Sequence, residues 1–227
     1  MNRAFSPAGH GNDSRASISR GPWVRWLAAT ALASTAALMV GCGGSDAPAA
    51  PALLSCDDGM KTAFKPDAQT QVVLVKAFKQ GDPLTLTSPV PAGTPVAAAN
   101  VCLVKLNVGP GNAGPADAPS TSAGIGIEVW LPATDRWNNR FHALGGAGWQ
   151  GGPAGSATAI ASLAAANVAG VEGAVSSTTD TGHAGPGGAF AMNPDGTINQ
   201  VLWTDFASRA IHEQAIKTKA LSTAFYG

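Results

Sequence analysis

A cluster of glycines that directly follows a short apolar run is the part of this chain best suited to chemistry. The run at residues 141–144 leads into Gly145, Gly146, Gly148, Gly151 and Gly152. Because glycine has no side chain, such a loop can adopt positive φ angles and present its backbone N–H groups to an anion. Two interpretations stay open from the loop alone: a turn that only lets a strand reach a helix, and a loop whose amides stabilise an oxyanion during acyl transfer.

A second candidate is the sequence S-T-T-D-T-G-H at residues 177–183. Asp180 and His183 have the residue types of an acid–base pair, and they follow a strand candidate, where open α/β sheets hold their ligands. For Asp180 we expect a structural role instead, because a carboxylate in such a loop accepts backbone N–H bonds. Asp180, His183 and Trp149 are retained as candidate residues of a substrate pocket.

Strands and helices must position these two loops. Valine-rich or alternating segments predict strands at residues 71–78, 100–108, 125–132 and 141–144. An alanine-rich segment favours a helix at residues 157–167, and residues 168–176 are a further strand candidate. Strand, glycine loop, helix and strand make a crossover unit, whose two strands should be parallel. The sequence therefore predicts an α/β fold with a mostly parallel sheet and flanking helices.

An amphipathic helix is predicted at residues 205–225. Its apolar stripe should pack on the sheet, and consists of Phe206, Ala210, Ile211, Ala215, Leu221 and Phe225. The opposite face should be polar, and carries Asp205, Arg209, Glu213 and Lys217 at four-residue spacing. His212 is expected to be structural, because no nucleophile candidate accompanies it at a strand end. Trp137, beside a turn, is expected to close an edge of the core.

Three motifs follow one another along the chain. They are W-N-N-R-F-x-x-L-G-G-A-G-W at residues 137–149, S-T-T-D-T-G-H at residues 177–183, and R-A-I-H-E with K-A-L-S-T-A-F-Y-G at residues 209–227. Together they resemble the tannase and feruloyl esterase family, over about Cys56 to Gly227. The resemblance implies a secreted α/β-hydrolase that cleaves aromatic carboxylic esters with a catalytic serine and no cofactor.

The nucleophile motif of such hydrolases, G-x-S-x-G, does not occur in these 227 residues. The resemblance implies that the serine, the Asp and the His of the triad lie beyond Gly227, so we expect the N-terminal part of a longer enzyme, truncated before the nucleophile elbow. Its own contribution would be the oxyanion hole, from the backbone N–H groups of Gly146 and Ala147. Alone, the piece should be inactive and should expose a sheet edge. A calcium ion in the family's lid would take its ligands from beyond Gly227.

The beginning of the chain resembles an export signal. Arginines precede an apolar run at residues 26–40, which suits a signal peptide and is short for a membrane span. The residues before Cys42 also resemble a bacterial lipoprotein processing site, with plain signal cleavage as the alternative. We therefore predict an export signal with lipidation of Cys42 at residues 1–42, a Pro/Ala/Gly linker at residues 43–55 and the hydrolase domain at residues 56–227. The protein should be exported, as an outer-membrane lipoprotein or in the periplasm or medium.

The two remaining cysteines, Cys56 and Cys102, are expected to form a disulfide. An exported protein meets oxidising conditions, and an even number of cysteines remains if Cys42 carries lipid. Cysteines at comparable places in the resembled family support this pairing. No metal site is expected, because the sequence has neither a C-x-x-C nor an H-E-x-x-H pattern.

Charge and glycine spacing argue against other classes of function. Lys plus Arg and Asp plus Glu number 14 each, so the chain has no basic surplus for nucleic acid. The glycines do not have the G-x-G-x-x-G spacing of a dinucleotide site. The expected partner is a small aromatic ester, with membrane contact only through a lipid anchor; no feature predicts an oligomeric state. The alternative is a lipid-tethered module that binds a ligand through the glycine loop and Trp149 without chemistry.

Overall fold

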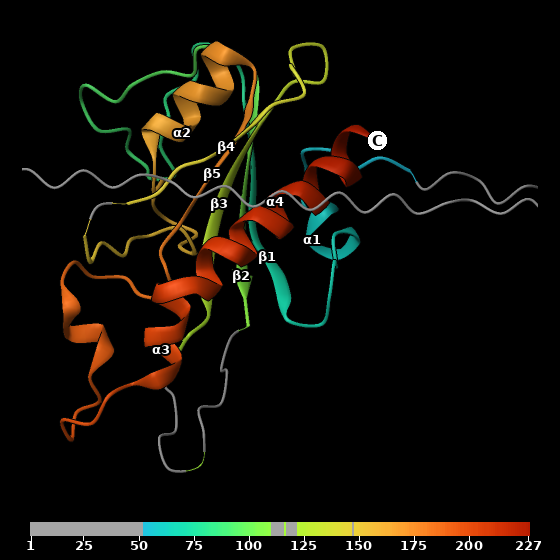
Figure 1. Ribbon diagram of the computed structural model, residues 1–227. Coiled ribbons are helices and arrows are strands. Elements are labelled where there is room, and N and C mark those ends of the chain that lie inside the picture. Colours follow the sequence, from blue (N-terminus) through green and yellow to red (C-terminus); the bar gives the residue numbers. More distant parts are fainter. Residues whose placement is uncertain (1–51, 110–115, 117–121, 147) are drawn as a thin grey trace, which may run out of the picture. The chain divides into compact units, whose positions relative to one another are not determined.

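The computed structural model describes residues 52–109, 116, 122–146 and 148–227 (Figure 1). The predicted export signal, Cys42 and Ala147 lie outside these residues, so the expectations for them stay predictions. None of the helices in the described ranges is long and apolar enough to span a bilayer.

Five strands form one sheet, in the order β1-β2-β3-β5-β4. The strands are β1 Thr70–Phe78, β2 Val101–Val108, β3 Ile125–Pro132, β4 Phe141–Ala143 and β5 Val175–Thr179. The β4–β5 pair is parallel, as the predicted crossover unit requires. The pairs β1–β2, β2–β3 and β3–β5 are antiparallel, so the expectation of a mostly parallel sheet is wrong for this part of the fold. No helix lies between β1 and β2 or, among the described residues, between β2 and β3, so these consecutive strands lack the crossover helix that usually joins a parallel pair.

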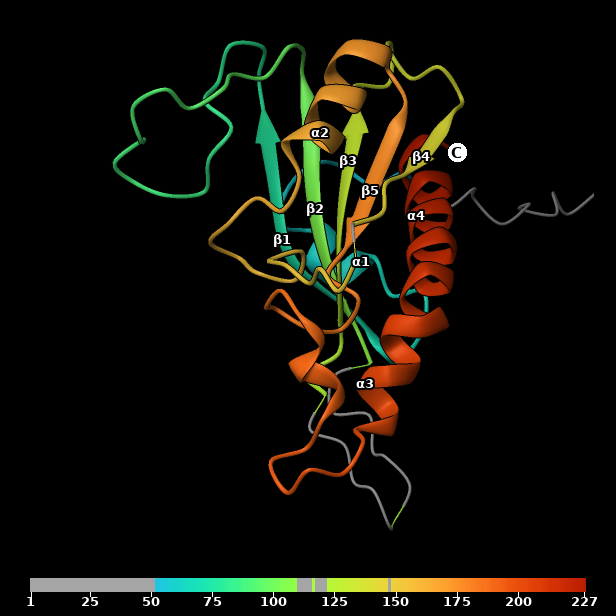
Figure 2. The ribbon, with the colours of Figure 1, turned by 60° about the vertical axis from the view of Figure 1, so that its left-hand side comes forward.

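Helices cover both faces of the sheet (Figures 1 and 2). They are α1 Met60–Ala63, α2 Leu163–Asn167, α3 Gln200–Thr204 and α4 Ala210–Tyr226, with π-helical turns at Val168–Glu172 and Asp205–Arg209 and a 3-10 turn at Gly188–Ala191. One core cluster joins α1 and α4 to the face that carries Ile125, Ile127 and Val129. The other joins α2 to the opposite face through Leu103 and Trp130. This alternation along β3 is what the sequence predicts.

The segment between β4 and β5 departs from the expected pattern. Residues 157–162 are not helical, because the N–H groups of Ala161 and Ser162 donate to the Glu128 side chain instead of to a helix. Residues 168–172 are a π-helical turn and not a strand. The chain reverses at Gly173, with φ of 71°, where an added Cβ would lie 2.4 Å from the carbonyl oxygen of Arg136. The strand therefore begins only at Val175.

The amphipathic helix is present, and its buried face agrees in part with the predicted one, since Ala210, Leu221 and Phe225 are buried. Ile211 is 51% exposed, whereas Asp205 and Lys217 are buried. Each buried charge has partners: Arg209 binds Asp205, and Lys217 binds Asp67 and Glu213. The π-helical turn at Asp205–Arg209 rotates the residues before α4, so a regular helical period assigns them to the wrong face.

Trp137 closes an edge of the core, as predicted. Its ring stacks on Tyr226 at a centroid distance of 4.0 Å, and the Tyr226 hydroxyl donates to the Pro132 carbonyl at 2.7 Å. Trp137 thereby joins the turn after β3 to the end of α4.

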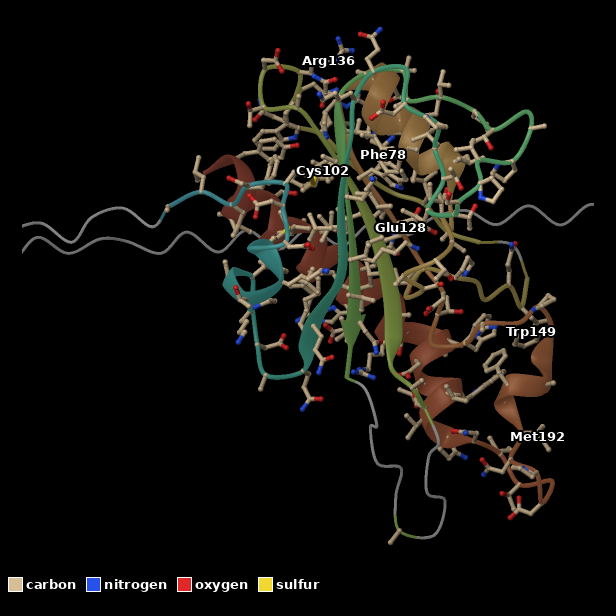
Figure 3. All side chains as sticks on the ribbon, turned by 180° about the vertical axis from the view of Figure 1, so that it is seen from behind. Phe78, Cys102, Glu128, Arg136, Trp149 and Met192 are labelled. Atoms are coloured by element: carbon tan, nitrogen blue, oxygen red, sulfur yellow. A yellow bond between two sulfur atoms is a disulfide. The ribbon has the colours of Figure 1, made fainter. Side chains whose placement is uncertain are left out.

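The expected disulfide joins Cys56, before α1, to Cys102 in β2. Figure 3 labels Cys102 beside the segment that enters α1. The bridge closes a loop with a sequence separation of 46 residues. It ties the first described residues to the central part of the sheet.

Replacing both cysteines by serine should lower the free energy of unfolding by about 3 to 5 kcal/mol, because the open loop gains entropy in the unfolded chain. Urea titration measures the difference. Reductant should bring the wild-type protein to the stability of the variant and leave the variant unchanged. Equal urea midpoints for the oxidised wild-type protein and the variant would contradict this expectation.

Candidate functional site

The glycine loop leaves the sheet at the carboxyl end of β4, beside β5. The Leu144 N–H still donates to the Ser177 carbonyl at 2.8 Å, after which pairing with β5 ends. The N–H groups of Gly145 and Gly146 donate to no acceptor among the described residues. Unpaired amides at a strand's carboxyl end suit the binding of a carbonyl or carboxylate oxygen.

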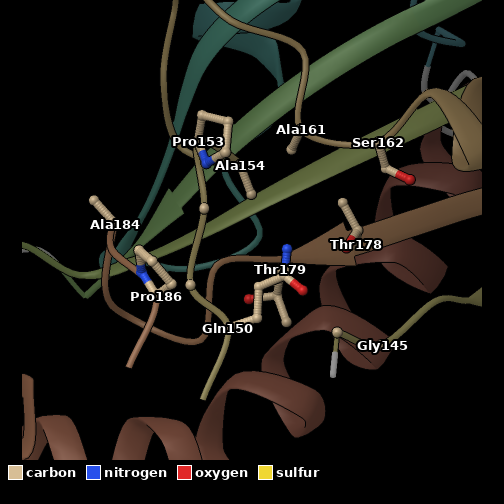
Figure 4. A pocket seen from close by; sticks show the side chains of 13 residues that line it. Gly145, Gln150, Pro153, Ala154, Ala161, Ser162, Thr178, Thr179, Ala184 and Pro186 are labelled. Atoms are coloured by element: carbon tan, nitrogen blue, oxygen red, sulfur yellow. The ribbon is translucent and has the colours of Figure 1, made fainter. Parts of the chain in front are cut away.

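A pocket of about 390 Å³ opens beside this loop (Figure 4). Its lining combines the glycine loop, the segment before α2, the carboxyl end of β5 and the loop that follows β5. Thr178 and Thr179 face Pro153 and Ala154 across it in Figure 4, and Gln150 is the longest side chain in the lining. The pocket thus offers amides, hydroxyls and one side-chain amide, which can orient a small polar group.

Asp180 has the structural role that we expected. Its buried carboxylate accepts from the N–H groups of Gly126 at 2.8 Å, Gly182 at 2.9 Å and Gly155 at 3.4 Å. The backbone of β3 approaches Asp180 so closely that an added Cβ at Gly126 would lie 2.1 Å from the carboxylate. Burial raises the pKa of Asp180 to about 6, against the opposing effect of the three N–H donors. The Asp180 carboxylate therefore connects β3 to the segment before α2 and to the loop that follows β5.

The structure does not bring Asp180 and His183 together as an acid–base pair. The Nε2 atom of His183 lies 3.1 Å from the Trp149 carbonyl oxygen, and its Nδ1 atom lies 3.2 Å from Thr181 Oγ1. Neither His183 nor Trp149 nor Asp180 lines the pocket of about 390 Å³; Asp180 lines a neighbouring one of about 460 Å³. Their role as pocket residues stays a prediction.

Trp149 belongs to a cluster of rings beside the glycine loop. Its ring lies 5.1 Å from Phe206 and 5.6 Å from Trp203, and the His183 ring stacks on Phe190 at 3.9 Å. Figure 3 labels Trp149 close to the segment before α3. The cluster attaches this segment to the glycine loop.

A buried ion pair that the sequence analysis missed supports the wall of the pocket. Lys105 Nζ lies 2.8 Å from Glu128 Oε2, and both side chains are fully buried. Lys105 donates to the carbonyls of Pro153 at 2.9 Å and Ala159 at 2.6 Å. Glu128 accepts from the Ser162 N–H at 3.0 Å. Burial lowers the pKa of Lys105, and the charge of Glu128 opposes that change. The available signal was that Lys105 and Glu128 are each the one charged residue of a largely apolar strand.

No group of three or more histidine, cysteine or acidic side chains that could hold a metal ion occurs in the part of the chain that the structure describes.

Solved structures with the same arrangement are α/β-hydrolase-type esterases. Feruloyl esterase B from Aspergillus oryzae is similar with a TM-score of 0.55 at 23% identity, over 75% of this chain and 29% of that one. Tannin acyl hydrolase from Aspergillus niger is similar with a TM-score of 0.50 at 21% identity, over 76% of this chain and 29% of that one. At these identities the likeness shows the fold.

The family model for tannase and feruloyl esterase matches residues 112–227, more than half of the chain. The chain belongs to this family. A probable feruloyl esterase from Arthroderma benhamiae is 34% identical over 102 residues, which are 44% of this chain and 18% of that protein. The chain therefore spans less than a third of the length of these relatives.

Replacing Lys105 by methionine should cost about 3 to 5 kcal/mol of unfolding free energy, because Glu128 would stay buried without its cation. The double variant Lys105→Met, Glu128→Leu should cost clearly less, since no charge is left unpaired. Lys61→Met is the matched control, because its ion pair with Asp58 is exposed and should contribute less than about 1 kcal/mol. Urea titration compares the variants; a harmless Lys105→Met would disprove the assigned role.

The raised pKa of Asp180 predicts a specific dependence of stability on pH. A carboxyl group with a raised pKa in the folded state stabilises the fold fully below its ordinary pKa of 3.8, and this contribution is lost as pH rises through about 6. The free energy of unfolding should therefore fall by on the order of 2 to 3 kcal/mol between about pH 4 and pH 7. Asp180→Asn should remove this part of the pH profile. Unfolding measured at a series of pH values should show the difference, and identical profiles would refute it.

Proposed function

We propose that the whole protein hydrolyses esters of aromatic carboxylic acids through an acyl-enzyme formed on a serine. Family membership supports an ester hydrolase. The names feruloyl esterase and tannin acyl hydrolase belong to similar proteins, and they suggest the aromatic acid as the substrate class. The observation that carries the proposal is a pair of backbone amides, of Gly145 and Gly146, that donate to no acceptor among the described residues and lie at the edge of a pocket.

In this proposal the glycine loop supplies part of the oxyanion hole. When an ester carbonyl is attacked, negative charge develops on its oxygen, and a fixed N–H donor stabilises that charge more than it stabilises the substrate. We assign this donor to the backbone of Gly146, with Ala147 as the second candidate. The chain directly after the loop is attached to Lys105 and Asp180, which favours the assignment, because a donor that is already oriented needs no rearrangement during the reaction.

The nucleophile in this proposal is a serine activated by a histidine and a carboxylate. The chain lacks a G-x-S-x-G motif, so we assign the triad to residues of the whole protein outside this sequence. The chain alone should therefore bind an aromatic ester or acid weakly without turning it over.

We also propose that the protein is exported. The disulfide between Cys56 and Cys102 supports this, because such bonds persist in oxidising compartments. Lipidation at Cys42 and an outer-membrane location are part of the same proposal and depend on the resemblance of the leader to a lipoprotein processing site.

The test is hydrolysis of methyl gallate and methyl ferulate by the whole protein, with two substitutions at one site. Gly146→Pro removes the N–H donor and should lower kcat by about 100- to 1,000-fold. Gly146→Ala keeps the N–H, and its Cβ would meet Gln150 only at an ordinary contact of 3.4 Å, so its loss should be far smaller.

Equal losses in the two variants would show that bulk, and not the lost donor, matters at Gly146. Binding of an aromatic acid by a folded whole protein that hydrolyses neither ester would favour the non-catalytic module.

A further inference from the structure

We propose that His183 is a positioning residue, which fixes the glycine loop by donating a hydrogen bond from Nε2 to the carbonyl oxygen of Trp149. The inference rests on the proposed function, because that loop carries the assigned oxyanion donor. It gives the D-T-G-H motif a task that differs from acid–base chemistry.

The contacts of the ring determine which nitrogen carries the hydrogen. Nε2 lies 3.1 Å from the Trp149 carbonyl oxygen. A carbonyl oxygen only accepts, so Nε2 must be the donor. Nδ1 lies 3.2 Å from Thr181 Oγ1, whose hydroxyl donates to the Asp180 carbonyl at 2.7 Å. Among the described residues no carboxylate lies within ion-pair distance of the ring. The ring thus holds a carbonyl and forms no ion pair with a carboxylate of the described residues, although its charge acts on Asp180 from a greater distance.

The orientation of the ring is itself fixed. The His183 ring stacks on Phe190 with an interplanar angle of 17°. Its backbone N–H donates to the Asp180 carbonyl at 3.1 Å, which closes the turn through Thr181 and Gly182. The same turn is held by the Asp180 carboxylate, which accepts from the Gly182 N–H. Asp180 therefore places the histidine, and the histidine places the loop.

Backbone bonds join the two loops around this contact. The Gly152 N–H donates to the His183 carbonyl at 3.0 Å, and the Gly187 N–H donates to the Trp149 carbonyl at 3.2 Å. An added Cβ at Gly151 would lie 2.1 Å from the His183 carbonyl oxygen, so the glycine loop and the loop that follows β5 are in direct contact. The Trp149 carbonyl therefore accepts from two donors, the His183 side chain and the Gly187 N–H.

The position of Trp149 bears directly on the assigned donor. The next residue, Gln150, forms the surface against which Gly146 lies, since a Cβ at Gly146 would be 3.4 Å from the Gln150 Cβ and 3.6 Å from its carbonyl oxygen. Without the His183 bond the Trp149 carbonyl keeps the Gly187 N–H as its donor, so Gln150, and Gly146 with it, should become more mobile but stay attached. His183 lines no part of the 390 Å³ pocket, so it acts through the loop.

Two substitutions separate the hydrogen bond from the ring. His183→Phe keeps a ring to stack on Phe190 and loses the donor. His183→Gln loses the ring and keeps an N–H donor near the position of Nε2. In the present chain, amide hydrogen exchange of residues 145–152 should be about three- to tenfold faster in His183→Phe and close to wild type in His183→Gln. Unchanged exchange in His183→Phe, or equally fast exchange in both variants, would overturn the proposal.

A second pair of variants serves if His183→Phe fails to fold. Gly151→Ala should force the glycine loop away from His183 and speed exchange of residues 145–152 in the same way. Gly185→Ala is its control, because an added Cβ there meets nothing within 4 Å and the Gly185 carbonyl still accepts from Gly151. Equal exchange in these two variants would count against the attachment of the loops.

Kinetics of the whole protein give an independent readout. His183→Phe should lower kcat about three- to tenfold with little change in KM, since a mobile donor loses transition-state stabilisation more than substrate binding, and His183→Gln should restore most of it. A rise in KM with kcat unchanged would overturn the positioning role. If the whole protein hydrolyses no ester, the proposed function fails, while the exchange experiment still decides whether His183 holds the loop.

Discussion

The buried ion pair of Lys105 and Glu128 is the constraint on which the arrangement of the site depends. Burying two charges costs more than their attraction returns unless their remaining hydrogen-bonding groups find partners. Here the ammonium group reaches the carbonyls of residues 153, 154 and 159, and the carboxylate accepts from residues 161 and 162 and from Trp130. The pair therefore requires residues 153–162 to keep their irregular, non-helical course against the sheet, and that segment is one wall of the pocket.

The glycine loop needs such external support because its residues have little with which to hold themselves. A run of glycine and alanine buries almost no side-chain surface, so its conformation must come from groups elsewhere in the fold. Lys105 holds the chain directly after the loop at Pro153, and Asp180 holds it at Gly155. His183 holds the loop itself at Trp149, closest to the amides of Gly145 and Gly146. Lys105 belongs to β2, Asp180 directly follows β5, and His183 lies in the turn that Asp180 holds, so the rigidity of the sheet passes to the loop through these groups.

Sequence patterns predicted the elements whose structure depends on local period, and failed where a distant partner decides. The alternation at residues 125–132 gave the bounds of β3 as they stand, because both faces of that strand meet the core. Alanine propensity predicted a helix over residues 157–167, but Glu128 binds amides that the helix would need, so α2 starts at Leu163. The buried Lys217 was assigned to the polar face, since its partner Asp67 lies far away in the sequence. Pairings between residues far apart in the sequence do not alter the local hydrophobic period, so that period cannot predict them.

The glycines of the loop differ in whether their backbone geometry requires glycine. Gly148 has a positive φ of 56°, and Gly151 lies where any Cβ would meet the His183 carbonyl, so backbone geometry explains both. Gly145 and Gly152 have no positive φ, and an added Cβ at either would meet nothing within 4 Å. Neither conformation nor packing requires glycine there, yet both residues line the pocket. A side chain at either position would have open space beside it, and in the pocket that space is available to a ligand. This favours a binding loop over a simple turn, the choice that the sequence alone left open.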